Sequence, residues 1–263
     1  MSDSSVLRTE VDGEPVPAGY ARLSALTAFG HFTALQVRGG AVRGLGLHLA
    51  RLARANEELF GEPLDEDLVR SQVRHALAGG GVAASVRVAF VRPAPGEAVG
   101  MVVTAREPAD QPNSPQSLQS VAYQRPVAHI KQVGGGFGQS YFGAAARRAG
   151  FDDALLTGLG GVVAEAAIAN IAFFDGTGLV WPDAPCLEGI TMQLLESDAH
   201  GTDLKSRRAP IRLADLASFG GAVVTNARGI APVGRIDDVD LPIDPALVES
   251  VARAYRSVPW DVI

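Results

Sequence analysis

A lysine and a glutamate in the second half of the chain have the character needed for chemistry on an aldehyde. Lys131 is one of only two lysines, the other being Lys205, and arginine otherwise supplies the positive charge. Arginine stays protonated near neutral pH, so a lysine here indicates a need for an amine that can lose its proton. In an apolar setting such an amine can form an imine with an aldehyde. The alternative is an ordinary surface lysine.

Glu165 lies in the apolar run VVAEAAIAN, where a carboxylate is costly to bury unless it has a cationic partner. The protonated ring nitrogen of pyridoxal phosphate would be such a partner, and the same cofactor carries an aldehyde for a lysine. The two residues together therefore favour this cofactor. The alternative is that Glu165 faces solvent from an edge strand.

The phosphate of that cofactor would need a cradle, and two segments have suitable residues. Thr191 follows Gly189 at the start of an expected helix, where free backbone N–H groups suit an anion. The segment TNARG, residues 225–229, leaves a strand with small polar residues and could close the cradle. The alternatives are that Gly-Ile-Thr is a plain helix cap and that Arg51 is a solvated helix residue.

Several common catalytic motifs are missing from the sequence. There is no GxxxxGK[ST], GxSxG, HExxH or CxxC, and the glycines at 134–136 and 138 do not have GxGxxG spacing. The five histidines are scattered, so no metal site is expected. Cys186 is the only cysteine, which excludes an internal disulfide and fits a reducing compartment.

The composition is that of a globular protein, with 47% hydrophobic and 20% charged residues. A net charge of −6 and no basic run longer than two residues argue against nucleic-acid binding. The N-terminal residues lack the features of a signal peptide, and no stretch reaches the roughly 18 to 20 apolar residues of a membrane span. We therefore expect a cytoplasmic protein with no membrane partner.

Turn and periodicity signals predict a series of helices and strands. In the first half we expect strands over 29–38, 84–93 and 97–108, a hairpin turn at 39–40, and helices over 48–61 and 65–81. In the second half we expect helices over 140–150, 189–201, 211–220 and 244–258, and strands over 153–158, 161–176, 178–182 and 222–226. The first residues are expected to form a loose polar lead.

The proline-rich, polar segment REPADQPNSPQS, residues 106–117, is the best linker candidate. The predicted organisation is an α/β N-terminal domain over 1–105, a linker over 106–118 and a C-terminal domain over 119–263. The predicted fold class is α+β.

In their order, these segments resemble the class IV aminotransferases, which are fold-type IV pyridoxal-phosphate enzymes. The family includes branched-chain and D-amino acid aminotransferases and aminodeoxychorismate lyase. The resemblance runs from about Phe29 to Pro232, and its most specific part is GFDDALLTGLGGVVAEAAIANIAFFDG at 150–176. The shorter matches are HLARL at 48–52 to H-x-x-R-L, HIK at 129–131 to the Schiff-base lysine segment, CLEGIT at 186–191 to L-x-G-I-T, and TNARGIAPV at 225–233 to the last phosphate loop.

The resemblance implies a role for each matched residue. Lys131 would hold the cofactor as a Schiff base and then move a proton, Glu165 would face the pyridine nitrogen, and Arg51 would bind phosphate. The other implied cofactor-binding residues are Leu187 on the ring, the backbone of Ile190 and Thr191 at the phosphate, and Thr225 and Asn226 in the last loop. Phe29 and Arg228 are the expected substrate-binding residues, although Arg228 could instead be a loop residue paired with an acid.

The family resemblance also implies the architecture. A small N-terminal α/β sandwich and a larger C-terminal pseudo-barrel would enclose the cofactor, and the protein would be a homodimer. The chain departs from the family pattern at several positions. Gly135 and Gly136 stand where asparagine and tyrosine are usual, which would widen or loosen the site. The remaining departures are Met192 for an arginine, Ala166 and Ala167 for serine or threonine, and Leu35 for an acid.

The expected activity is transamination between an amino acid or amine and a 2-oxo acid. The first alternative is the elimination of pyruvate from an aminodeoxychorismate-like substrate, because the strand FTALQV at 32–37 is similar to the first-strand motif of the lyase. The second alternative is a catalytically weak pseudoenzyme that kept the fold, which the glycines after Lys131 would allow.

Overall fold

A computed structural model describes residues 6–15, 29–78, 83–92, 96–133, 136–197 and 204–263. The chain forms two compact units. The first comprises Met1–Ala109, Ile130–Gly135 and Pro259–Ile263, and the second comprises Asp110–His129 and Gly136–Val258. No helix in the described ranges is long and apolar enough to cross a membrane.

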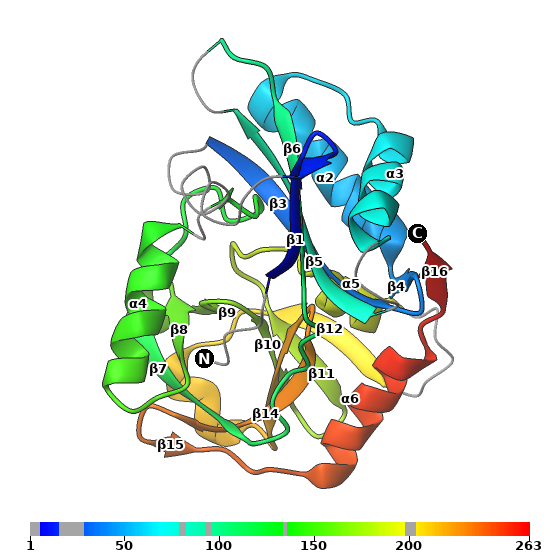
Figure 1. The fold of residues 1–263 in the computed structure, drawn as a ribbon. Helices are drawn as coiled ribbons and strands as arrows, with labels where there is room; N and C mark the ends of the chain where they lie inside the picture. The colour runs from blue at the N-terminus through cyan, green and yellow to red at the C-terminus, as the bar shows by residue number, and fades with distance from the viewer. Residues whose placement is uncertain (1–5, 16–28, 79–82, 93–95, 134–135, 198–203) are drawn as a thin grey trace. The chain divides into compact units, whose positions relative to one another are not determined.

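The first unit is built on a seven-stranded antiparallel sheet. Its strands, in spatial order, are β16 (Trp260–Val262), β4 (Ala41–Arg43), β3 (Phe29–Arg38), β5 (Ala83–Arg92), β6 (Gly100–Arg106), β1 (Val6–Val11) and β2 (Glu14–Pro15). Helices α2 (Leu45–Phe60) and α3 (Glu66–Leu77) lie along one face of this sheet (Figure 1). Alternate residues of β3, such as Leu35 and Val37, are buried in the core that these helices share.

Local signals explain where these two helices begin and end. Gly61 ends α2 with a φ of 69°, a left-handed conformation that favours glycine. Asp65 caps α3 by accepting a hydrogen bond from the Leu68 N–H. Acidic residues in the first turn of α3 and basic residues in its last turn suit the helix dipole.

The second unit contains a nine-stranded mixed sheet. Its main path runs β12 (Lys205–Ala209), β11 (Gly178–Pro182), β10 (Asn170–Phe174), β13 (Ala222–Asn226), β14 (Gly229–Ile236), β7 (Gln116–Ala122), β8 (Asp153–Thr157) and β9 (Val163–Ala166), and β15 (Val239–Asp240) pairs with β14. The strand pairs β11–β12, β14–β7 and β7–β8 are parallel. Buried residues of these strands and of the helices beside them form three apolar clusters.

The described residues of this unit also form three α-helices and two short 3₁₀ turns. The helices are α4 (Phe137–Arg148), α5 (Ile190–Glu196) and α6 (Pro245–Ser257), and the 3₁₀ turns are Leu159–Gly161 and Leu213–Ser218. Helix α4 packs against β8, and α5 packs against both α6 and β13. Asp244 caps α6 by accepting from the Ala246 N–H, and Pro245 occupies its first turn.

Most of the predicted elements are confirmed, and the differences have physical reasons. The predicted loose lead is wrong, because residues Val6–Val11 form β1 and pair with β6. Its Glu10 is fully buried beside Arg8 and His75, so the sequence shows no simple apolar alternation there. The single strand expected over 161–176 is two strands, β9 and β10, which a short turn separates.

The domain boundaries predicted from the sequence, 1–105, 106–118 and 119–263, stay a prediction. In the structure, residues 107–115 contain no helix or strand, and β7 begins at Gln116. Two later segments, Ile130–Gly135 and Pro259–Ile263, belong to the first unit. Lys131 therefore belongs to the first unit.

Candidate active site

Lys131 is held in the first unit by main-chain contacts to β3. The Phe32 N–H donates to the Lys131 carbonyl at 2.9 Å, and His31 and Gln132 form an antiparallel bridge. The Lys131 side chain is half-buried, with its Nζ 4.9 Å from the centroid of the Phe32 ring. Strand β3 thus determines where this amine lies.

Arg51 is a buried cation on α2. It is 8% exposed, and its Nη2 donates to the hydroxyl of Thr33 on β3. Its Nε–H has no hydrogen-bond partner among the residues that the structure describes. Burial, together with the charge of Arg54, lowers the Arg51 pKa to about 10. A buried guanidinium with an unused donor is suited to an anionic ligand.

His48 lies one helical turn before Arg51 and joins the same group of side chains. Its Nδ1 is 2.7 Å from the Thr33 hydroxyl. Burial, and then the positive charges of Arg51 and Lys131, hold the His48 pKa well below its ordinary value. His48 is therefore neutral near pH 7. The charges that lower its pKa are those of the two predicted cofactor-binding cations, Arg51 and Lys131.

Glu165 lies on β9, an edge strand of the second sheet, yet it is only 4% exposed. The alternative that it faces solvent is therefore wrong. Its Oε1 accepts from Arg125 Nη1 at 2.8 Å, and its Oε2 accepts from the Leu187 N–H at 3.3 Å. A carboxylate has about four acceptor positions, so these two contacts alone do not use all of them.

Arg125 is the functional residue that the sequence analysis missed. It is buried, and its Nη1 also donates to the Ala128 carbonyl at 2.9 Å. One signal was present, because a carboxylate in an apolar run needs a cation, and Arg125 stands six positions before Lys131 in QRPVAHIK. The sequence does not show which of the many arginines is the partner.

The Leu187 loop is tied to the sheet by Asn170. Asn170 Nδ2 donates to the Leu187 carbonyl at 2.8 Å. A Cβ on Gly189 would lie 2.0 Å from Asn170 Oδ1, so only glycine fits at this position. Helix α5 begins at the next residue, and Ile190 and Thr191 are both buried.

The start of α5 is linked to the end of β13. The Thr191 hydroxyl donates to the Asn226 carbonyl at 2.8 Å. Thr225 is 0% exposed, and its hydroxyl has no hydrogen-bond partner within the described ranges. A buried hydroxyl without a partner is costly, which indicates that a ligand group satisfies it.

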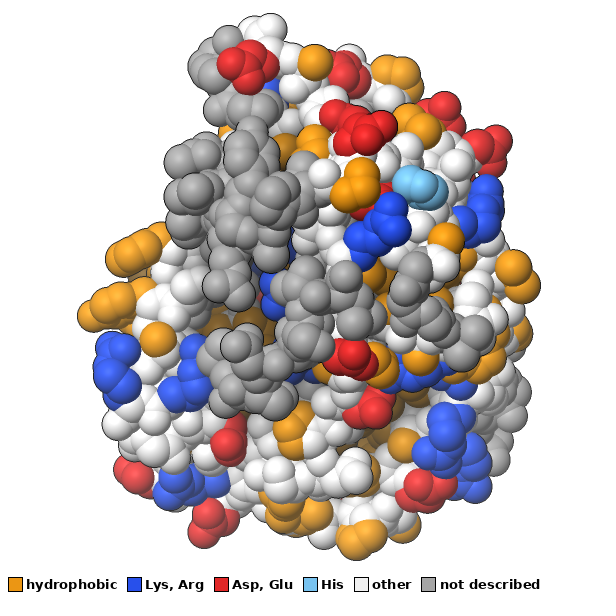
Figure 2. Space-filling view, in the orientation of Figure 1, with side chains coloured by type: hydrophobic (Ala, Val, Ile, Leu, Met, Phe, Trp, Pro, Cys, Tyr) orange, Lys and Arg blue, Asp and Glu red, His pale blue; other side chains and the backbone are white. Residues whose placement is uncertain are grey.

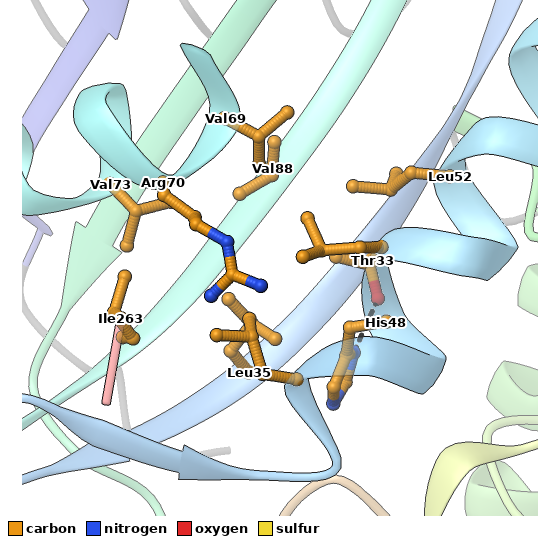
Figure 3. Close-up of a pocket in the computed structure, with 11 residues that line it drawn as sticks. Thr33, Leu35, His48, Leu52, Val69, Arg70, Val73, Val88 and Ile263 are labelled. Carbon is orange, nitrogen blue, oxygen red and sulfur yellow. Dashed lines mark hydrogen bonds between the residues drawn. The ribbon is translucent and has the colours of Figure 1, made fainter. Parts of the chain in front are cut away.

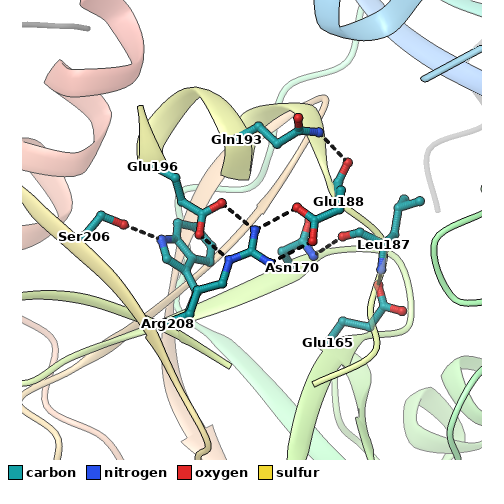
Figure 4. A network of polar contacts seen from close by, with 9 residues as sticks. Glu165, Asn170, Leu187, Glu188, Gln193, Glu196, Ser206 and Arg208 are labelled. Carbon is teal, nitrogen blue, oxygen red and sulfur yellow. Dashed lines mark hydrogen bonds and ion pairs between the residues drawn. The ribbon is translucent and has the colours of Figure 1, made fainter. Parts of the chain in front are cut away.

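A network around Arg208 lies next to the Leu187 loop (Figure 4). Arg208, on β12, donates to both Glu188 and Glu196, with N···O distances of 2.7 to 2.8 Å. The Glu188 carbonyl accepts from Gln193 Nε2 at 2.9 Å. The network therefore connects the loop, helix α5 and strand β12, which the polar sequence of β12 did not predict.

The two predicted substrate-binding residues lie in different units. Phe29, in the first unit, is 57% exposed and packs edge-on against Phe60. Arg228, in the second unit, is exposed in the turn between β13 and β14. Its N–H donates to Asn226 Oδ1 at 2.8 Å, and its carbonyl accepts from the Gln111 N–H at 3.1 Å.

Gly136 in the glycine-rich segment after Lys131 has an unusual backbone conformation. Gly136 has a φ of 62° immediately before α4, where glycine is favoured. This is a backbone reason for glycine at that position. Gly134 and Gly135 lie outside the described residues.

The available groups fit pyridoxal phosphate. In the first unit, Lys131 offers an amine, and Arg51 offers an N–H donor that no described residue accepts from. In the second unit, Glu165 offers a buried carboxylate, and Thr225 offers a hydroxyl that has no partner among the described residues. These are the groups that an aldehyde, a phosphate and a ring nitrogen require.

The sequence matches the family described as amino-transferase class IV over residues 30–236. No curated protein sequence matches the chain.

Several solved structures have a similar fold. The branched-chain aminotransferase of Thermoproteus uzoniensis with norvaline has a TM-score of 0.81 at 21% identity, covering 96% of this chain and 94% of that one. The branched-chain amino acid aminotransferase of Escherichia coli has a TM-score of 0.82 at 16% identity, covering 97% and 95%. A putative 4-amino-4-deoxychorismate lyase from Legionella pneumophila has a TM-score of 0.77 at 18% identity, covering 88% and 92%. At these identities the likeness establishes the fold, and the predicted α+β, fold-type IV architecture is confirmed.

Proposed function

Because this chain belongs to the class IV aminotransferase family, we propose that it uses pyridoxal phosphate to move an amino group between an amino acid or amine and a 2-oxo acid. The observation that carries the proposal is the buried cation Arg51, 8% exposed, in the same unit as the half-buried Lys131. The Nε–H of Arg51 lacks a partner in the described part of the chain, and a phosphate oxygen would supply one.

Each residue that the family pattern matches would bind a particular part of the cofactor. In the first unit, Arg51 would bind the phosphate and Lys131 would react with the aldehyde carbon. In the second unit, Glu165 would accept the N–H of the ring nitrogen. The remaining ligands would be Leu187 on the ring, the backbone N–H groups of Ile190 and Thr191 and the side chains of Thr225 and Asn226 at the phosphate.

Bound pyridoxal phosphate supplies a ring that accepts the electrons left when the substrate loses its α-proton. Lys131 Nζ would take this proton from the α-carbon and return it to a neighbouring carbon, as a general base and then a general acid. Glu165 would hold a proton on the ring nitrogen. Arg125 and the Leu187 N–H orient the Glu165 carboxylate for this contact, because each of them binds one of its oxygens.

The role of Lys131 can be tested with purified protein and added pyridoxal phosphate. The mixture should show a visible absorption band that borohydride abolishes. Lys131→Ala should lose the band, because it has no amine to react with the aldehyde. Lys131→Arg should lose it as well, because arginine keeps the charge but stays protonated.

The other lysine provides a matched control. Lys205 is exposed on β12, so Lys205→Ala should keep the band. If Lys131→Ala kept the band unchanged, Lys131 would not be the residue that reacts with the cofactor. Amino donors supplied with pyruvate or 2-oxoglutarate then test for transamination.

Elimination of pyruvate is the second candidate function. The strand FTALQV, which is similar to the first-strand motif of aminodeoxychorismate lyase, forms the middle of β3 beside Lys131. The reaction differs from transamination because it needs no amino acceptor. Release of pyruvate from aminodeoxychorismate without any 2-oxo acid would favour the lyase.

We also infer that two copies of the chain associate, as in the family. Helix α4 exposes two stacked aromatic residues, Phe137 at 86% and Tyr141 at 51%. Hydrophobic side chains lie at the outer edge of the molecule where α4 is drawn (Figure 2). Exposed aromatic side chains of this kind are frequent at protein interfaces. Sedimentation or light scattering would give the oligomeric state.

A further inference from the structure

The Thr33 hydroxyl joins two side chains of helix α2 in the core of the first unit. It accepts a hydrogen bond from Arg51 Nη2, and it lies 2.7 Å from His48 Nδ1. Thr33 is 1% exposed, and neither His48 nor Arg51 is more than 8% exposed. Residues 18 and 15 positions apart are thus brought together around one buried oxygen.

The direction of these hydrogen bonds follows from the chemistry of the three groups. A guanidinium can only donate, so the Thr33 oxygen accepts from Arg51. His48 is neutral, because burial and the charges of Arg51 and Lys131 lower its pKa. Its Nδ1 can therefore accept the Thr33 hydroxyl proton, with the ring proton on Nε2. In this arrangement the hydroxyl both donates and accepts.

The surroundings strengthen this arrangement. Thr33 and His48 line a small pocket together with aliphatic side chains such as Leu35 and Leu52 and with the side chain of Arg70 (Figure 3). Thr33 and His48 are themselves almost fully buried, and at a buried site a hydrogen bond is stronger than in water and an unsatisfied polar group is more costly. The Arg51 side chain is therefore restrained at one end of its guanidinium, while its Nε–H has no partner in the described residues.

We propose that Thr33 and His48 are positioning residues that hold Arg51 with its Nε–H directed at the phosphate of the cofactor. The inference rests on the proposed function, in which Arg51 binds this phosphate. An arginine side chain otherwise loses considerable rotamer freedom when it binds a ligand. By restraining the guanidinium beforehand, the Thr33 hydroxyl reduces that loss. Thr33 and His48 do not themselves contact the phosphate in this proposal.

The test compares pyridoxal phosphate with pyridoxal, which has the aldehyde and ring but no phosphate. The dissociation constant of each is measured by fluorescence with the cofactor-free protein. Thr33→Val keeps the shape of the side chain but removes the hydroxyl. It should weaken the binding of pyridoxal phosphate roughly 10-fold and leave the dissociation constant of pyridoxal unchanged. Both compounds carry the aldehyde, so the contribution of the reaction with Lys131 cancels in the ratio of the two dissociation constants.

Two variants serve as controls. Thr33→Ser restores the hydroxyl and should recover most of the affinity for pyridoxal phosphate. Thr9 is a second buried threonine of the same sheet, and Thr9→Val should leave the ratio unchanged. His48→Leu should weaken the binding of pyridoxal phosphate, as Thr33→Val does. The variant that carries both substitutions should bind pyridoxal phosphate only slightly more weakly than either single variant. Equal weakening of both compounds by Thr33→Val, or no weakening, would overturn the proposal.

Inorganic phosphate separates this proposal from the proposed function. Phosphate should raise the melting temperature of the cofactor-free protein, and Thr33→Val should reduce that rise. If phosphate behaves in this way but pyridoxal phosphate does not bind, the positioning of Arg51 stands and the proposed function fails. If the unmodified protein binds neither compound, both are wrong.

Discussion

Arg51 in the first unit and Arg125 in the second are equally buried, each 8% exposed, but their surroundings differ. Arg125 has a full ionic partner, because its Nη1 is 2.8 Å from Glu165 Oε1. Arg51 donates to the neutral hydroxyl of Thr33, and its Nε has no partner among the residues described. Burying a charge is costly unless it is paired, so the two arginines have different tasks.

This difference distinguishes a buried charge that is paired within the folded chain from one that is available to bind a ligand. Arg125 and Glu165 compensate each other inside the folded chain, so Arg125 orients the acid and adds to stability. Arg51 has no acidic partner among the described residues, so we expect it to lower the stability of the free protein and to be compensated when an anion binds. This distinction gives three predictions about stability, from the largest effect to the smallest.

Arg125→Met should have the largest effect. It leaves Glu165 buried without its cation, so we expect the free energy of unfolding to fall by about 3–5 kcal/mol. Urea denaturation in the absence of cofactor measures this change. Arg207, whose side chain is 56% exposed and pairs with Asp175, is a matched control. Arg207→Met should cost less than about 1 kcal/mol, and equal losses in both variants would contradict the role assigned to Arg125.

Acidification should destabilise the first unit. Burial lowers the pKa of His31 from 6.5 to about 4 and holds that of His48 well below 6.5. As the pH falls below 6.5 the unfolded chain binds protons that the folded chain does not, so the free energy of unfolding decreases. For His31 alone the loss at pH 4 is roughly 3 kcal/mol. Urea denaturation at several pH values would show it.

His31→Gln provides the comparison for this pH dependence. Glutamine does not titrate, so the variant should lose less stability between pH 6.5 and 4 than the unmodified protein. His31 lies 3.4 Å from Asn56 and stacks on Phe90, so the variant will also be less stable at neutral pH. The slope against pH is therefore the quantity to compare. An unchanged slope would mean that His31 does not contribute.

Arg51→Met should have the smallest effect on stability, and of the opposite sign. The Arg51 charge is buried and has no acidic partner within the described part of the chain, so its removal should raise the free energy of unfolding of the cofactor-free protein by about 1 kcal/mol. The same change should weaken the binding of pyridoxal phosphate, because the phosphate loses a charge-assisted hydrogen bond. A loss of stability similar to that of Arg125→Met would remove the distinction between the two arginines.

Regular periodicity allowed much of the fold to be predicted. The predicted strand over 29–38 coincides with β3, and the strands at 178–182 and 222–226 coincide with β11 and β13. Segments without an apolar pattern were missed. Strand β12, KSRRA, is polar because it lies at the edge of its sheet, and it forms only by pairing with β11.

For the candidate site, the sequence showed which types of residue contribute better than it showed which residues they pair with. It indicated that a carboxylate at Glu165 needs a cation, but Arg125 is one of many arginines, 40 positions away. It named Arg51 from the family pattern, but the Thr33 hydroxyl and neutral His48 became evident only with the helix packed on the sheet. The roles of Lys131, Phe29 and Arg228 stay predictions.

The sequence alone determined the helices and the strands with a regular apolar pattern, the family and the types of group offered to a ligand. Periodicity, capping residues and glycine turns act over a few positions, so a single sequence contains them. The tertiary structure decided which buried charges are paired and which are not. Pairing depends on distances between side chains far apart in the chain, and only the folded backbone sets those distances.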